Sequence, residues 1–146
     1  MLIAIAIEST HMFSSDNTSG WLRALYQSIA GAVTDTQWRH VHHIIRKTGH
    51  FTGYGLLGVV WLRSWLLFWR TPMRHRTASV LCRYAFALAL SCTMLVATFD
   101  ELHQSFMADR TGLVSDVLLD TSGAFALMAL AVLLYVLRHK QYGQPF

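Results

Sequence analysis

Long apolar runs alternate with short polar segments along this chain, and three of the runs are long enough to cross a membrane. They cover approximately residues 48–69, 81–100 and 117–137. A helix that crosses the hydrocarbon core needs about 20 mostly apolar residues. We therefore predict a membrane-spanning helix in each of these ranges.

The opening apolar run, residues 1–13, is shorter than the others. As a helix it would cover only about 20 Å, against a hydrocarbon core of about 30 Å. We interpret it as a first span that is either short and tilted or truncated at its start. With this run included, the prediction is one domain over residues 1–146, an all-α transmembrane bundle of about four spans.

Residues 18–33 show a different pattern, in which apolar side chains recur at helical spacing. Trp21, Leu25 and Ile29 fall on one face, opposite Arg23 and Gln27. This pattern predicts an amphipathic helix in the outer membrane interface. A loop helix packed on the bundle is the alternative. A further short helix is predicted to start near residues 35–36 and to run into the span that follows.

Composition supports the membrane class. The chain is 53% hydrophobic and 14% charged, whereas soluble domains are about 25% charged. Its lysines and arginines form no basic stripe of the kind that binds nucleic acid, so no nucleic-acid partner is expected. Cys82 and Cys92 lie in one predicted helix, roughly 15 Å apart along its axis, which is too far for a disulfide.

The positions of the charges predict the topology. Arginines without a nearby acid lie between the spans 48–69 and 81–100 or just inside the latter: Arg70, Arg74, Arg76 and Arg83. All eight acidic residues fall on the other side of the predicted membrane or within one turn of it. Cytoplasmic loops carry the excess of Lys and Arg. Both termini are therefore predicted to be cytoplasmic.

Ionisable groups at or just inside the spans are candidate functional residues, because placing a charge there costs a few kcal/mol. On the span 48–69 and the turn before it, Arg46, His50 and Tyr54 are spaced i, i+4, i+8 and share a face. Small residues there would let another helix approach closely: Gly49, Gly53 and Gly58.

Two other spans carry acidic residues at the same predicted membrane depth. Each group is predicted to share one helix face: Asp100, His103 and Gln104 on one, and Asp116, Asp120 and Gly123 on the other. Glu101 is expected to point aside. If the faces of the three helices converge, the cations Arg46, Lys47 and Arg110 would neutralise the carboxylates of one polar site on the outer side.

Simpler interpretations stay open for several of these residues. Arg46 and Lys47 could anchor the helix at the membrane interface, and His50 and Tyr54 could form hydrogen bonds between helices. Asp116 could cap the last span, where a carboxylate complements the helix dipole.

The adjacent acids Asp100 and Glu101 are the hardest to explain structurally. At a helix C-terminus they oppose the macrodipole, so a partner, a bound cation or a functional use should offset them. Asp100 and His103, with His50, form only a weak metal-ligand pattern, and neither a metal nor a cofactor is expected. The remaining histidines of this region are expected on a solvated interfacial face: His40, His42 and His43.

Three motifs carry these polar residues: Arg46-Lys47-x-x-His50-Phe51-x-x-Tyr54, then Asp100-Glu101-x-His103-Gln104-Ser105-Phe106 with Asp109-Arg110, and Asp116-x-x-x-Asp120-x-x-Gly123. In combination they resemble the VanZ-like family of bacterial membrane proteins, over nearly the whole chain. The chain departs from the family pattern in its short first hydrophobic segment. It also has Met107-Ala108 where a Pro-Gly turn is common before the arginine.

The resemblance implies a multi-pass protein of the bacterial cytoplasmic membrane. The founding member of the family is associated with resistance to the lipoglycopeptide teicoplanin. Our leading hypothesis is an outer-face pocket that binds an anionic or amphiphilic envelope component, such as lipid-linked cell-wall material or a lipoglycopeptide. Arg46, Lys47 and Arg110 would bind phosphate or carboxylate groups. The acidic residues would orient these cations or accept hydrogen bonds from sugar hydroxyls, and His50, Tyr54 and Gln104 would complete the lining.

Two alternatives stay open. One is a membrane hydrolase or transferase that acts on a lipid-linked phosphate or sugar. Glu101 or Asp100 would be its general base, and His50 or His103 the partner of that base. The other is a structural bundle in which the polar residues only fix the packing of the helices.

Overall fold

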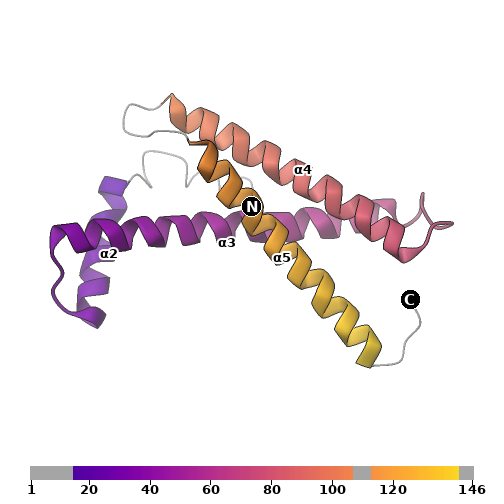
Figure 1. The fold of residues 1–146 in the computed structure, drawn as a ribbon, viewed down its shortest axis with the longest axis horizontal. Coiled ribbons are helices and arrows are strands. Elements are labelled where there is room, and N and C mark those ends of the chain that lie inside the picture. Colours follow the sequence, from indigo (N-terminus) through magenta and orange to yellow (C-terminus); the bar gives the residue numbers. More distant parts are fainter. Residues whose placement is uncertain (1–14, 107–112, 142–146) are drawn as a thin grey trace. The chain divides into compact units, whose positions relative to one another are not determined.

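The structure, a computed structural model, describes residues 15–106 and 113–141, and most of these residues are helical (Figure 1). Four helices follow one another along the chain: α2 (Ser15–Ala30), α3 (Asp35–Trp69), α4 (Ala78–Ser105) and α5 (Val114–Gln141). No strand occurs in these residues, so the predicted all-α class is confirmed. The chain divides into two compact units, Met1–Gly49 and His50–Phe146, and α3 contributes residues to both.

Within the described ranges, three helices are long and apolar enough to cross a membrane, namely α3, α4 and α5. The predicted first span, residues 1–13, lies outside the described residues. The predicted short helix near residue 35 and the span that follows are one continuous helix, α3. Large apolar side chains are exposed on all three helices, among them Leu67, Phe99 and Leu134. Such an exterior suits lipid tails, which are as apolar as leucine.

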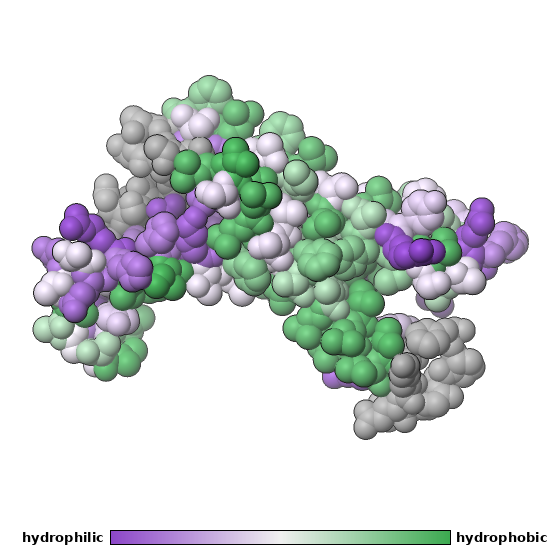
Figure 2. All heavy atoms as spheres, viewed as in Figure 1, coloured by the Kyte–Doolittle hydropathy of each residue, from purple (hydrophilic) through white to green (hydrophobic). Residues whose placement is uncertain are grey.

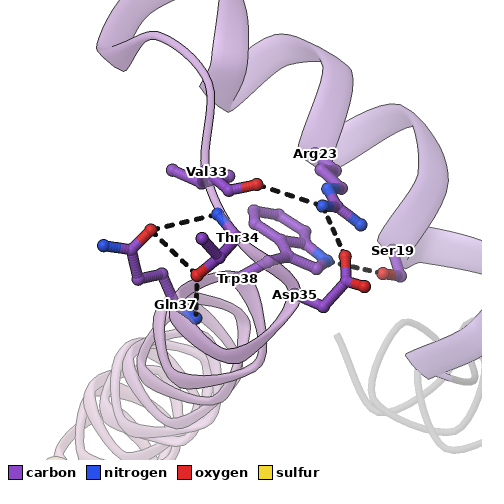
Figure 3. A network of polar contacts seen from close by, with 7 residues as sticks. All are labelled: Ser19, Arg23, Val33, Thr34, Asp35, Gln37 and Trp38. Atoms are coloured by element: carbon purple, nitrogen blue, oxygen red, sulfur yellow. Dashed lines mark hydrogen bonds and ion pairs between the residues drawn. The ribbon is translucent and has the colours of Figure 1, made fainter.

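Local capping explains where α2 ends and α3 begins. Gly31 follows α2 with a positive φ of 84°, and its amide donates to the carbonyl of Gln27 at 3.0 Å. Such left-handed glycines commonly terminate helices. Thr34 and Gln37 then form a reciprocal capping box: the Thr34 amide donates to Oε1 of Gln37 at 3.0 Å, and the Gln37 amide to Oγ1 of Thr34 at 3.4 Å (Figure 3).

The corner between α2 and α3 is organised around Trp38, which is 4% exposed. Its indole Nε1 donates to Oγ of Ser19 at 2.7 Å (Figure 3). Beside it, Arg23 pairs with Asp35 at 2.7 Å and also donates to the carbonyl of Val33. Polar residues thus attach α2 to the start of α3.

The opposite, apolar stripe of α2 is exposed, as the amphipathic pattern predicts; its members are Trp21, Leu25 and Ile29. The prediction of a solvated histidine face is confirmed for His40 and His43 but wrong for His42. His42 is buried because its ring packs against Trp38, with centroids 5.5 Å apart.

In the second unit, α4 buries a stripe of small residues at four-residue spacing that ends in two polar side chains: Ala85, Ala89, Thr93, Ala97, Glu101 and Gln104. Two of its members, Ala85 and Ala89, pack with Leu62 of α3 and with Ala124 and Met128 of α5. Small side chains allow helices to approach closely in a membrane, where no hydrophobic effect drives them together. Cys82 and Cys92, both on α4, are free.

Candidate functional site

Polar side chains from three helices meet near the C-terminal end of α4, within the second unit. We call them the acidic cluster: His50 and Tyr54 from α3, Asp100, Glu101 and Gln104 from α4, and Asp120 from α5. In Figure 1, α4 and α5 lie close together where α4 ends and α5 begins. The expected convergence of the three polar helix faces is therefore confirmed for His50, Tyr54, Asp100, Gln104 and Asp120.

Asp100 is held by donors from two helices. The hydroxyl of Tyr54 donates to its Oδ2 at 3.0 Å, and Nε2 of Gln104 donates to the same oxygen at 2.9 Å. Both donors are buried, with Tyr54 2% and Gln104 4% exposed. Hydrogen bonds to a carboxylate are stronger than neutral ones, so the bond from Tyr54 fixes α3 to α4 at this position, whereas the bond from Gln104 lies within α4.

Asp120 is the most deeply buried acid of the cluster, with an exposed fraction of 0%. Neither of its carboxylate oxygens has a hydrogen-bond partner within the described part of the chain. The closest ion-pair contact is with Nδ1 of His50, which lies 3.6 Å from Oδ2. That distance is too long for a hydrogen bond. A buried acid without donors is costly in a protein interior and more so in a membrane.

The His50 ring connects Asp120 to the rest of the cluster. It stacks on the ring of Tyr54, with centroids 6.2 Å apart and planes 16° from parallel. Its side chain is 27% exposed, whereas Asp120 is enclosed. His50 therefore lies between the buried carboxyl group of Asp120 and the surface. In this position its imidazole can transfer a proton between the two.

Glu101 ties the two helix ends together. Its Oε2 accepts a hydrogen bond from the amide of Leu113 at 2.9 Å. Leu113 directly precedes α5, so this carboxylate satisfies a free amide at the N-terminus of that helix and complements its dipole. The expectation that Glu101 points aside is wrong, because Glu101 continues the buried small-residue stripe of α4.

Glycines bring α3 and α5 close enough to assemble the cluster. A Cβ added at Gly123 would collide with the backbone carbonyl of Phe51, and one at Gly58 would lie 2.9 Å from Cβ of Ala124. Gly55 is less strictly confined, since a Cβ there would overlap the flexible end of the Leu127 side chain and lie 3.0 Å from the carbonyl oxygen of Gly123. The prediction of close approach is thus correct for Gly58, but a Cβ at Gly53 would meet nothing within 4 Å among the described residues.

The other predicted site residues lie in different surroundings. His103 is exposed, so it does not share the buried face of Asp100 and Gln104 as expected. Asp116 is half-buried in the first turn of α5, two residues inside the helix start rather than at its cap. Arg46 and Lys47 are half-buried on α3 and belong to the first unit. Arg110 lies outside the described residues.

Among the described residues, no three His, Cys, Asp or Glu side chains are grouped so that they could hold a metal ion. The cluster instead offers carboxyl oxygens as acceptors, together with an imidazole and a phenol. The amide of Leu113 and the buried α4 stripe were missed in the sequence; the four-residue spacing from Ala85 to Glu101 was the signal that could have revealed the stripe.

The sequence model of the VanZ/LLP1 family matches residues 1–135, which is most of the chain. The chain belongs to the VanZ/LLP1 family. It is thus a VanZ family membrane protein in which three described helices are suited to cross the bilayer. The resemblance inferred from the three motifs is confirmed. No curated protein and no solved structure matches the chain.

Two of the three motifs supply the cluster with residues from α3 and α4, and the third supplies Asp120 of α5. In this VanZ family member the motif residues therefore meet in space although they are spread from His50 to Asp120 along the chain. The family assignment names no ligand or reaction, so what the cluster does has to be argued from its chemistry.

Proposed function

We propose that the acidic cluster binds the polar head of an amphiphilic envelope component, while the helices hold the protein in the membrane. The observation that carries this proposal is the state of Asp120, which is fully buried and has no hydrogen-bond donor among the described residues. Ionisable groups inside membrane helices are expensive and typically functional. A ligand that brings a donor to Asp120 would offset the cost of burying it.

The chemistry of the cluster favours a head group rich in donors. Sugar hydroxyls or an ammonium group would satisfy the oxygens of Asp120, and His50 would lie next to the same group. That Arg46, Lys47 and Arg110 bind phosphate or carboxylate groups stays a separate prediction from the sequence, made because Arg binds such groups in a bidentate way. Lipid-linked cell-wall material and lipoglycopeptides such as teicoplanin combine both kinds of group.

Glu101 and the pair Tyr54–Gln104 have positioning roles in this scheme. Glu101 is engaged with the Leu113 amide, and Asp100 is engaged with Tyr54 and Gln104. These contacts hold α3, α4 and α5 around Asp120. A ligand would then meet one unsatisfied carboxyl group within a set of satisfied ones.

Native mass spectrometry of protein gently extracted from its own host membrane tests the proposal. We expect a co-purifying lipid-linked species on the wild-type protein and its loss on Asp120→Asn, which keeps the shape of the side chain but cannot ionise. Asp35→Asn is the matched control, because Asp35 is exposed at the α2–α3 corner. Equal retention on both variants, or no bound species on correctly folded wild-type protein, would contradict the proposal.

The finer hypothesis of teicoplanin resistance needs a separate test. Expression of the wild-type protein in a susceptible host should raise the inhibitory concentration of teicoplanin, and Asp120→Asn should abolish the increase at equal protein level. Unchanged susceptibility with the wild-type protein would remove teicoplanin from the proposal and leave lipid-linked material as the ligand.

The proposal also requires that the cluster faces the outer side of the bacterial cytoplasmic membrane. This orientation rests on the unopposed arginines near the α3–α4 loop, which would be cytoplasmic. Reporter fusions should place both termini in the cytoplasm. A C-terminus on the outer side would reverse the orientation and direct the cluster at a cytoplasmic ligand instead.

A further inference from the structure

We propose a second binding site, a groove between α4 and α5 that holds an acyl chain of an anionic phospholipid whose head group pairs with Arg83. It lies at the N-terminal part of α4 and the C-terminal part of α5, whereas the acidic cluster lies near the opposite ends of these helices. The inference therefore does not depend on the proposed function of the cluster.

The groove has a volume of about 420 Å³, within the range of about 300–1,000 Å³ that is usual for ligand pockets. Apart from Arg83, its lining is almost entirely apolar: Cys82, Phe86, Ala129, Val132, Leu133 and Val136. The α5 residues are spaced i, i+3, i+4, i+7 and therefore form one helix face. A hydrocarbon chain fits such a lining, since it offers no groups for a polar ligand.

Two features shape the groove. Ala129 is the smallest side chain of the α5 face that lines it, so the wall recedes at this position. At one side, Phe86 packs edge-on against Phe125, with ring centroids 5.5 Å apart and planes at 83°. This contact holds Phe86 toward α5, where it also forms part of the lining.

Charge identifies the head group. Arg83 is exposed and lines the groove, and it forms no ion pair with any of the described residues. The loop between α3 and α4, five or more residues earlier, adds three exposed cations: Arg70, Arg74 and Arg76. Figure 2 shows the hydrophilic surface over this loop and the hydrophobic surface of the C-terminal half of α5. Basic residues at a membrane boundary attract anionic lipids, and basic pockets between spans bind their head groups.

The test uses protein in detergent, supplied with equal amounts of phosphatidylglycerol and phosphatidylcholine, with native mass spectrometry as the readout. We expect phosphatidylglycerol to dominate the retained lipid. Arg83→Gln should lower the ratio of retained phosphatidylglycerol to phosphatidylcholine about fivefold, the effect of one basic group near an anionic surface. Arg63→Gln, at an exposed arginine of α3 outside the groove, should leave the ratio unchanged.

A pair of α5 variants tests the groove itself. Ala129→Phe fills it and should abolish the retained lipid, whereas Ala126→Phe introduces the same side chain at an exposed position outside it and should have no effect. If Ala129→Phe fails to fold, the Arg83→Gln ratio decides alone, because Arg83 is exposed. Equal retention of both lipids by the wild type would overturn the proposal. It would also be overturned if the wild type were a dimer and Ala129→Phe disrupted the dimer while the lipid stayed bound, because the groove would then be an interface between two copies.

Discussion

The α2–α3 corner and the acidic cluster are both polar networks built around a buried aromatic donor, Trp38 in the corner and Tyr54 in the cluster. In the corner the partners are close in sequence: Trp38 donates to Ser19, and Arg23 pairs with the exposed Asp35. In the cluster Tyr54 donates to Asp100, which is 46 residues away on another helix.

The two networks also differ in the kind of group that they leave without a hydrogen-bond partner. His42 Nε2 in the corner and both oxygens of Asp120 in the cluster lack hydrogen-bond partners among the described residues. A neutral imidazole is cheaper to bury than a carboxylate. Among the described residues the corner thus leaves an imidazole nitrogen without a partner, whereas the cluster leaves a carboxyl group, which is the group that the proposed ligand would satisfy.

The largest effect is expected from the contact that assembles the cluster. Gly123→Ala should lower stability by about 1–3 kcal/mol, because the new Cβ meets the rigid backbone of Phe51. Thermal unfolding in detergent measures the loss. Gly53→Ala is the control: it has open space and should gain up to about 1 kcal/mol from helix propensity. A Gly123→Ala protein that melts at the same temperature as the wild type would disprove the close approach of α3 and α5.

Removing the aromatic hydrogen-bond donor from each network compares how much each network contributes to stability. Tyr54→Phe should cost about 1.5–3 kcal/mol, because a buried hydrogen bond to a carboxylate is lost. Trp38→Phe removes the neutral hydrogen bond to Ser19 and should cost about 0.5–1.5 kcal/mol for that bond, in addition to lost packing. Ser19→Ala isolates the hydrogen bond from the packing. A Tyr54→Phe protein as stable as the wild type would show that this contact does not hold the helices together.

Neutralising Asp120 should have the opposite sign. Asp120→Asn should leave stability unchanged or raise it by about 1 kcal/mol, because it removes a buried group that can carry charge and has no donor among the described residues. The unfolding midpoint in detergent, without added lipid, is the measurement. A clear loss of stability would assign Asp120 to the structural framework and would weaken its proposed role in binding.

The smallest effect is expected at the exposed ion pair of the corner. Asp35→Asn should cost only about 0.2–1 kcal/mol, since the Asp35 side chain is 84% exposed and water screens the pair. Increasing salt should reduce the difference from wild type. A loss as large as that of Tyr54→Phe would mean that the corner supports the fold as strongly as the cluster does.

The apolar pattern alone was sufficient to predict the three helices suited to cross a membrane, because such helices need long apolar runs and α3, α4 and α5 have them. The capping box of Thr34 and Gln37 was not predicted, although the two residues have its spacing, because only the structure pairs them. The spacing on α3 and α4 correctly placed Tyr54, Asp100 and Gln104 on facing sides.

The polar residues of α4 did not by themselves reveal the burial of Glu101 or the exposure of His103. Near the C-terminal end of α4, neighbouring helix faces are about equally polar. Which face turns inward depends on how the other helices pack against the stripe of small residues. The sequence by itself determined the family, the helical class and the set of polar residues, since periodicity and motifs are properties of the chain. Only the tertiary structure decided that Tyr54 donates to Asp100 and that Asp120 has no donor among the described residues, because hydrogen bonds between helices depend on how closely their backbones approach, here at Gly123 and Gly58.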